Sequence, residues 1–169
     1  DMLPRRPGLA GLLDAALPAA VSAAPDHSAY VAPELPPRDE IWRNAGLLLI
    51  DAARARAERT MPRVLDYALG HLDALAQHDQ SALNLALKGQ MGLLSPLWNW
   101  MDTAAARPLI PELDPVLLHF VANPKPWDWL EGHPRMQFFD DYARFLSGHF
   151  GITLERRNGS ASWTQLNAG

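Results

Sequence analysis

The residues with the clearest chemical potential are a histidine and a lysine that lie six positions apart. His119 follows the apolar run 116–118, and Lys125 lies between Pro124 and Pro126. A neutral imidazole can bind a divalent metal ion, and an ammonium group can neutralise phosphate oxygens. Ligand sites of open α/β sheets lie beyond the carboxyl ends of strands, so both side chains are expected to face such a crevice. The alternative is a half-buried histidine and a surface lysine, and for the pair taken alone we favour that interpretation.

Two further segments combine polar groups with small residues. Asp79 and Gln80 stand at the expected start of a helix, where an aspartate is a common N-cap; the functional alternative is a carboxylate and an amide that face the crevice. The segment Asn44-Ala45-Gly46 precedes the apolar run 47–50. Its amide can bond a sugar hydroxyl and its small residues let a ligand approach the backbone, or the glycine only relieves crowding at a strand start.

The elements that must position these residues alternate between strands and helices. Apolar runs predict strands at 19–24, 44–51, 90–95 and 116–121; helical spacing predicts helices at 9–17, 60–75, 79–89 and 136–150; prolines predict a loop at 31–39. The run 44–51 has no polar alternation, which is typical of a strand buried on both faces. Thr60 is the expected N-cap of the helix that follows it. This alternation predicts an α/β fold with a layered sheet.

The composition is that of a folded globular protein and excludes several classes. Of 169 residues, 48% are hydrophobic and 20% are charged, and no apolar run approaches the roughly 18 residues of a membrane helix. Without cysteine the chain has neither a disulfide nor a thiolate metal site. The net charge of −4 and the scattered arginines argue against a nucleic-acid surface. We therefore expect a soluble protein, and the lack of cysteine fits a cytoplasmic one.

Taken together, the segments resemble glycosyltransferase family 8 in content and order. The resemblance rests on Asn-Ala-Gly-Leu-Leu-Leu-Ile-Asp at 44–51, Asp-Gln-x-x-Leu-Asn at 79–84, Trp-Asn at 98–99 and Leu-His-Phe-x-x-x-x-Lys-Pro-Trp at 118–127. It implies an α/β fold of the GT-A nucleotide-diphospho-sugar transferase type, lacking the N-terminal strands of the Rossmann-like sheet. Residues 1–150 would be the C-terminal part of one catalytic domain, and 151–169 a C-terminal tail.

The resemblance also implies a role for each candidate residue. Asp1 and His119 match ligands of a manganese ion, with magnesium as the alternative, and the first aspartate of the metal-binding motif would precede Asp1. The remaining matches are Asn44 and Ala45 (donor-sugar pocket), Lys125 (donor diphosphate), Asp79 (donor-sugar hydroxyls), Gln80 (beside the anomeric carbon) and Asp26 (acceptor side). Asp79 and Gln80 are the catalytic candidates. Ala122 stands where the family usually has glycine, and its methyl group would crowd the diphosphate.

The implied function is transfer of galactose or glucose from a UDP-sugar, with retention, to a glycan or a lipopolysaccharide-type, lipid-linked saccharide. No second carboxylate nucleophile stands out, so a front-face displacement near Gln80 is the easier hypothesis. Two alternatives stay open: a UDP-sugar hydrolase, and a degenerate relative that binds a glycan or partner without catalysis. Peripheral attachment to the inner face of the membrane also stays open. Because missing strands would expose sheet edges, we expect the chain alone to bind donor poorly and to aggregate.

Overall fold

The computed structural model describes residues 1–27 and 41–156, which belong to two compact units. One unit is Met2–His119, and the other comprises Asp1 and the residues from Phe120 onward. The loop predicted at 31–39 and residues 157–169 of the predicted tail lie outside the described residues. No helix in the described part of the chain is long and apolar enough to cross a membrane.

Two three-stranded sheets form the framework of the unit Met2–His119. The first has the order β1-β6-β5, and its strands are β1 (Met2–Pro4), β6 (Leu117–His119) and β5 (Trp100–Met101). The second has the order β3-β2-β4, with β3 (Arg43–Ile50), β2 (Val21–Pro25) and β4 (Gly92–Leu93). In each sheet one neighbour pairs antiparallel and the other parallel to the middle strand. The α/β class predicted from the sequence is confirmed.

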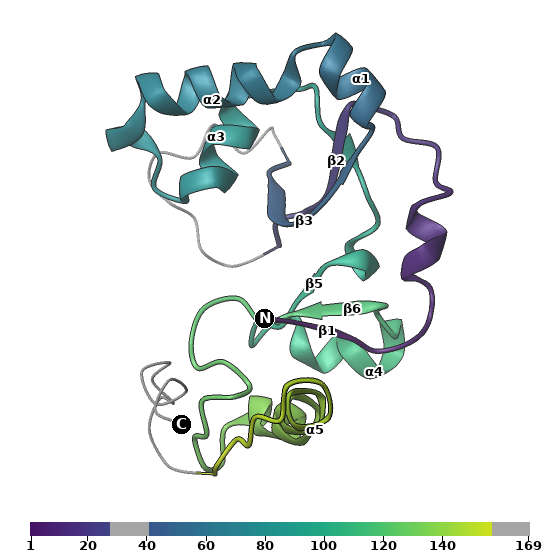
Figure 1. Cartoon of the computed structure of the whole chain (residues 1–169), viewed down its shortest axis with the longest axis vertical. Helices are drawn as coiled ribbons and strands as arrows, with labels where there is room; N and C mark the ends of the chain where they lie inside the picture. The colour runs from purple at the N-terminus through teal and green to yellow at the C-terminus, as the bar shows by residue number, and fades with distance from the viewer. Residues whose placement is uncertain (28–40, 157–169) are drawn as a thin grey trace. The chain divides into compact units, whose positions relative to one another are not determined.

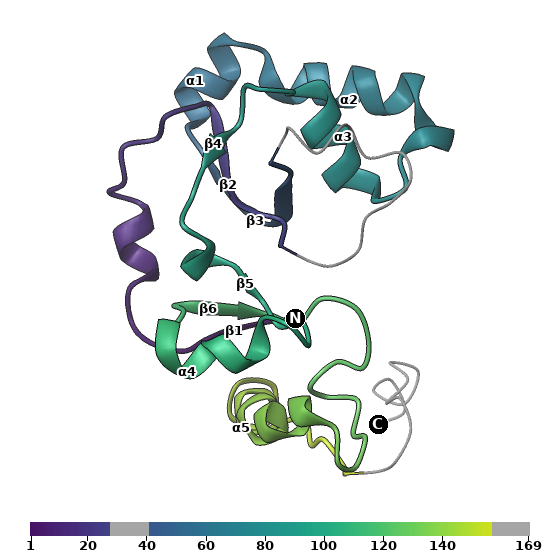
Figure 2. The ribbon, with the colours of Figure 1, turned by 180° about the vertical axis from the view of Figure 1, so that it is seen from behind.

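Helices α2 (Thr60–Gly70) and α3 (His78–Ala86) lie on the same side of β2 and β3 in Figures 1 and 2. Beneath them a buried cluster joins Val21 and Ala23 of β2 to Leu83, Leu87 and Met91. Apolar residues of 79–89 are therefore buried on one face of the helix, as their helical spacing predicts. A shorter helix, α1 (Ala52–Ala57), precedes α2, and α4 (Ile110–Leu113) precedes β6.

The strand predicted to be buried on both faces is an edge strand instead. Among the described residues β3 pairs only with β2, and Ile50 at its end is 42% exposed. Its uninterrupted apolar sequence was therefore a misleading indicator, because burial depends on which strands join the sheet. At 90–95 only Gly92–Leu93 forms a strand.

Helix starts also differ from the predictions. The N-cap of α2 is Arg59, with φ 53°, and Thr60 is already helical. The N-cap of α3 is Gln77, which places Asp79 in the first turn. Helix α1 was not predicted, although the Asp51 side chain caps it by accepting a hydrogen bond from the Arg54 N–H at 2.9 Å. The helix predicted at 9–17 is only the 3-10 turn η1 (Leu9–Leu12).

The second unit contains the helix predicted at 136–150, but in two pieces. A 3-10 turn, η5 (Pro134–Phe138), leads into α5 (Phe139–Phe150), which ends at Gly151 with φ 68°. Phe138 and Phe139 are buried, whereas Phe145 is 53% exposed. The Phe120 ring packs against Phe138, with ring centroids 5.1 Å apart, which ties the start of this unit to η5.

Candidate active site

Gln80 on α3 is the centre of a buried hydrogen-bond network in the unit Met2–His119. Its Oε1 accepts from Asn44 Nδ2 and from the Ala45 N–H, both at 3.0 Å. Its Nε2 donates to Asp26 Oδ2 at 2.6 Å and to Gln77 Oε1 at 3.0 Å. Four of the residues selected from the sequence, on α3, on β3 and directly after β2, are therefore brought together by direct contacts.

Asn44 continues the network towards β5. Its Oδ1 accepts from the Gly46 N–H at 2.9 Å and from Asn99 Nδ2 at 2.8 Å. Asn44 and Gln80 are 6% and 8% exposed, and Asn99 is fully buried. Buried amides of this kind are held in one orientation by their partners, since an unmade hydrogen bond there costs about 1–3 kcal/mol.

His119 lies at the end of β6, as its position after an apolar run predicted, and packs against Gly46 of β3. A Cβ atom added to Gly46 would lie 2.7 Å from His119 Nδ1 and closer still to Cε1. His119 is 8% exposed, and its backbone oxygen accepts from the Asp102 N–H at 2.9 Å. Gly46 therefore relieves crowding, which was one of the two interpretations of this glycine. The group that it makes room for is the imidazole of His119.

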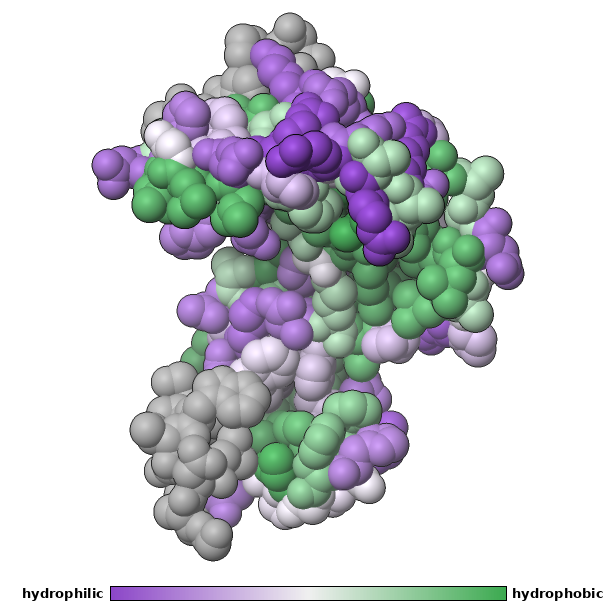
Figure 3. All heavy atoms as spheres, turned by 45° about the horizontal axis from the view of Figure 1, so that its top comes forward, coloured by the Kyte–Doolittle hydropathy of each residue, from purple (hydrophilic) through white to green (hydrophobic). Residues whose placement is uncertain are grey.

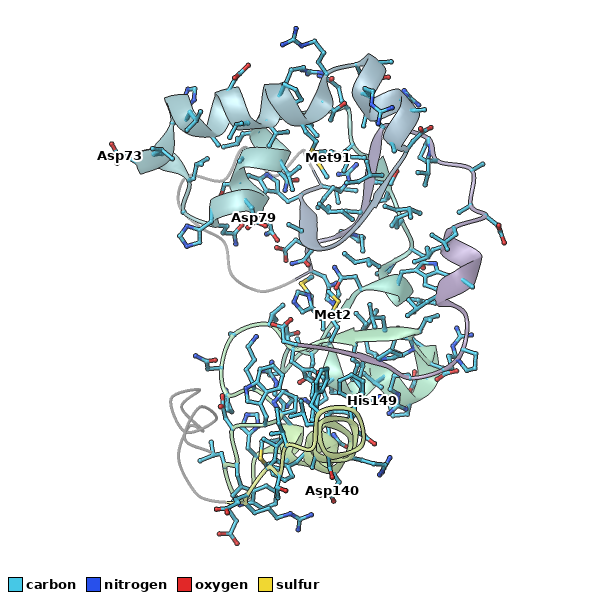
Figure 4. The ribbon with its side chains drawn as sticks, in the orientation of Figure 1. Met2, Asp73, Asp79, Met91, Asp140 and His149 are labelled. Carbon is cyan, nitrogen blue, oxygen red and sulfur yellow. The ribbon has the colours of Figure 1, made fainter. Side chains whose placement is uncertain are left out.

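Asp79 is exposed on the first turn of α3, beside the buried Gln80 (Figure 4). Asn84, one turn after Gln80, donates through Nδ2 to the backbone oxygens of Arg43 and Gln80, both at 2.8 Å, and accepts from the Arg43 N–H at 2.7 Å. It therefore ties α3 to the start of β3. The Asp-Gln-x-x-Leu-Asn segment thus presents the exposed carboxylate of Asp79, and its Asn84 amide is fixed by contacts with both α3 and β3.

In the second unit Lys125 pairs with Asp1. Lys125 Nζ donates to Asp1 Oδ2 and to the Phe120 backbone oxygen, both at 2.5 Å. Burial lowers the pKa of the Lys125 ammonium below its usual value, the charge of Arg135 lowers it further, and Asp128 opposes both. A cation under these conditions gains from an additional anionic partner, which suits contact with a phosphate group.

Arg135 shapes the segment that carries Lys125. Its guanidinium, in a side chain only 5% exposed, donates to the backbone oxygens of Val121 (2.8 Å), Ala122 (3.2 Å) and Pro124 (2.7 Å). Within this segment Ala122 has φ 56°, a left-handed conformation that favours glycine. The departure from the family pattern therefore falls where the backbone itself prefers glycine.

No three histidine, aspartate or glutamate side chains lie together as a metal site within residues 1–27 and 41–156. The two residues that the resemblance suggests as metal ligands belong to different units, Asp1 to one and His119 to the other.

Three residues with prominent contacts were not selected from the sequence as site candidates. Asn99 stood in the Trp-Asn segment that supports the resemblance, so a signal was present but no role was given to it. Arg135 and Asp102 carried no signal, because their importance comes from long-range contacts. Asp102 is fully buried and pairs through both oxygens with Arg107, at 2.6 and 3.0 Å.

One family model matches most of the chain. Glycosyl transferase family 8 matches residues 20–130. General stress protein A of Bacillus subtilis (strain 168) is 28% identical over an alignment of 118 positions, and the alignment covers 62% of this chain and 40% of that protein. The alignment therefore spans well under half the length of this relative.

Solved structures show the fold. The glycosyltransferase GlyE of Streptococcus pneumoniae TIGR4 superimposes with a TM-score of 0.62 at 24% identity, over 82% of this chain and 36% of that one. The galactosyltransferase LgtC, in complex with donor and acceptor sugar analogs, gives 0.61 at 22% identity, over 83% and 57%. The α/β fold is thus of the GT-A type, as the resemblance implied. Because the family match covers well over half of its residues, the chain belongs to glycosyl transferase family 8.

Proposed function

We propose that the protein containing this chain transfers a hexose, galactose or glucose, from a UDP-sugar to a glycan with retention of configuration. The observation that carries the proposal is the network of Gln80, Asn44 and Asp26, in which two buried amides and a carboxylate are held by one another. Fixed amides and carboxylates are suited to sugar hydroxyls, because they need no reorganisation when the ligand binds. LgtC, a structural relative, binds donor and acceptor sugar analogs, which supports a two-substrate site of this kind.

In this proposal each residue keeps the side of the site that the family resemblance implies. Asp79, exposed beside Gln80, accepts hydrogen bonds from donor-sugar hydroxyls. Asn44 and Ala45 line the donor-sugar pocket from β3, and Asp26 faces the acceptor. Gln80 holds these groups in register, since its amide contacts Asn44, Ala45 and Asp26 at once.

Lys125, with Arg135 behind it, binds the donor diphosphate and stabilises the charge that develops when UDP leaves. We further propose a manganese ion, with magnesium as the alternative. Asp1 offers a carboxylate, which pairs with Lys125, and His119 offers an imidazole, a donor set that suits manganese. The other ligands would be donor oxygens, water or side chains outside the described residues. When bound, the ion neutralises the diphosphate as a Lewis acid.

The proposal is tested in the full-length protein by measuring UDP release and the sugar product from UDP-galactose and UDP-glucose with manganese present. His119→Ala should lower turnover by about 100-fold or more, the size typical of losing one electrostatic contact to the transition state. His71→Ala is the matched control, because that ring is exposed and stacks on Tyr67 with centroids 4.2 Å apart. Full activity of His119→Ala, or activity unaffected by chelation of divalent ions, would contradict the metal assignment.

Two other activities would use the same residues. A UDP-sugar hydrolase would release free hexose at the same rate with and without a glycan acceptor, so product analysis under both conditions separates it from a transferase. A non-catalytic relative is favoured by Ala122, which stands where the family usually has glycine and has a left-handed φ of 56°. In that case calorimetry on the full-length protein would detect neither UDP nor manganese binding.

A further inference from the structure

None of the roles proposed so far involves Asn99, yet this residue forms one end of the hydrogen-bond network around Gln80. It stands between the turn η3 (Pro96–Trp98) and β5, and its backbone N–H donates to the Pro96 oxygen at 3.0 Å. Its side chain is fully buried, and Nδ2 donates to Asn44 Oδ1 at 2.8 Å. One side chain thereby connects the β5 edge of the first sheet to β3 in the second.

The orientation of each amide in this network follows from its backbone partners. A backbone N–H can only donate, so the Gln80 atom that it meets at Ala45 must be the oxygen. By the same argument the Asn44 atom that meets the Gly46 N–H is Oδ1. Asn99 must then present its NH2 group to Asn44, because two oxygens facing each other would repel. The nitrogen and oxygen positions are therefore determined by chemistry, without ambiguity.

With these orientations the hydrogen bonds run in one direction, from Asn99 to Asn44, from Asn44 to Gln80, and from Gln80 to Asp26. Hydrogen bonds that follow one another in this way polarise each other and strengthen. Both lone pairs of Gln80 Oε1 are engaged, by Asn44 and Ala45. Gln80 thus acts on the site by holding Asp26 through its NH2 group, with its oxygen directed away from that carboxylate.

The oxygen of the Asn99 amide adds a second argument. Asn99 Oδ1 is buried, and none of the described residues donates a hydrogen bond to it. A buried acceptor without a donor costs about 1–3 kcal/mol, so an apolar residue would serve better if the position only filled space. The NH2 group is the part of the Asn99 side chain that forms a hydrogen bond, and that bond holds Asn44 in place.

We propose that Asn99 is a positioning residue for the acceptor side of the site, which anchors Asn44 and, through Gln80, the Asp26 carboxylate. The functional part of this inference rests on the proposed transferase activity. The structural part, that Asn99 holds the Gln80 amide, stands independently of it. The competing explanation is that Asn99 merely joins the two sheets, in which case its loss would lower stability without acting through Gln80.

The test is a double-mutant cycle in the full-length protein. Asn99→Asp keeps the shape of the side chain and removes the donor, and Asn99→Ala removes the donor without adding a charge. With donor saturating, each should lower kcat about 10- to 100-fold, the effect of misplacing a reacting group by about 1 Å. The KM for the donor should rise as well, because Asn44 lines the proposed donor-sugar pocket. In a Gln80→Ala background the same substitutions should have no further effect on kcat, since the group they position is gone.

A matched control and a readout independent of activity complete the experiment. Thr60→Val alters another buried polar side chain of the same unit, 2% exposed, with no bond to the network, and should leave kcat unchanged. The side-chain NH2 resonance of Gln80, assigned by its loss in Gln80→Ala, should shift in both Asn99 variants and not in Thr60→Val.

Additive losses of kcat, or an unshifted Gln80 resonance, would overturn the positioning role. So would unfolding of both Asn99 variants while Thr60→Val stays folded, because Asn99 would then be needed for the fold itself. A wild-type protein that transfers no sugar would refute the proposed function, and the resonance shift would still decide whether Asn99 holds Gln80.

Discussion

At the scale of single residues, Gly46 shows how a small residue can be essential through contacts distant in the sequence. The sequence left open whether this glycine admits a ligand or relieves crowding, because nothing near position 46 names the group that approaches. The structure identifies that group as the imidazole of His119, 73 positions later, and Met2 Cε would also lie 2.8 Å from a Cβ atom added to Gly46. Only the packing of β3 against β6 brings the two together, so no local pattern predicts it.

Gly46→Ala should therefore displace His119. We expect the free energy of unfolding to fall by about 1–3 kcal/mol, the usual effect of overpacking, and turnover to fall with it. Gly70→Ala is the matched control, since no atom outside its own helix lies within 4 Å of the added Cβ. Denaturant titration and UDP release measure the two effects. Equal behaviour of the two variants would contradict the close contact.

Ala122 gives the opposite prediction. A φ of 56° lowers the stability of the folded state by about 1–2 kcal/mol for a residue other than glycine. Replacing alanine by glycine lowers stability by about 0.4–1 kcal/mol, because glycine gives the unfolded chain more conformational freedom. Ala122→Gly should then stabilise the protein by about 0.5–1 kcal/mol, the difference of these two. Ala68→Gly, inside α2, should destabilise it by about 1 kcal/mol. The sign of each change in thermal midpoint is the test, and a destabilised Ala122→Gly would argue against the left-handed conformation.

At the scale of elements, the sequence predicted the strands and helices that a local pattern of residues defines. It missed the features that depend on which strands and helices lie next to one another. The strands at β2 and β6 and the helix α3 were predicted, since apolar runs and helical spacing are set by adjacent residues. The edge position of β3 was not, because the choice of partner strands is made across the whole sheet. Helix α1 was missed because its alternating Ala and Arg residues form no apolar stripe, and its Asp51 cap alone is a weak signal.

The candidate site likewise contains residues that the sequence predicted and residues that it missed. Asp26, Asn44, Ala45 and Gln80 were selected from the sequence and meet at the Gln80 side chain, and Asp1 pairs with Lys125. The roles given to them came from the resemblance, which carries three-dimensional information that composition and spacing lack. Arg135 shows the limit, because three backbone oxygens from another segment give it its role and no motif marks it.

Arg135→Met tests whether η5 holds the segment that carries Lys125. Losing a charged donor to three carbonyl groups should destabilise the segment by about 1.5–3 kcal/mol, the range of hydrogen bonds to charged groups. Hydrogen exchange of the Lys125 amide, which donates to Asp128 Oδ2 at 2.9 Å, should accelerate, and weaker UDP binding should accompany it. Arg144→Met, on the exposed part of α5, is the control. Unchanged exchange at Lys125 would show that the segment holds its own conformation.

At the scale of the whole molecule, the exposed apolar surface is the feature that bears on behaviour in solution. Met61, Leu65, Leu69 and Leu72 recur at helical spacing along and just after α2 and are 40%, 57%, 63% and 66% exposed. Figure 3 shows apolar surface, in green, at its upper left. Within the described residues only Val64 of this helix packs against the buried cluster of β2 and α3. Contiguous apolar surface of this kind favours association.

The 169-residue chain should therefore self-associate, and a double variant, Leu65→Gln with Leu69→Gln, should reduce this without lowering stability. Both side chains are more than half exposed, so the substitutions remove little buried area. Light scattering over a concentration series measures association, and denaturant titration measures stability. Leu83→Gln, at 6% exposure, should instead destabilise the fold by several kcal/mol, since it buries a polar group in the cluster. If the double variant also unfolded more easily, the stripe would have to be covered by part of the same chain, and the association would need another source.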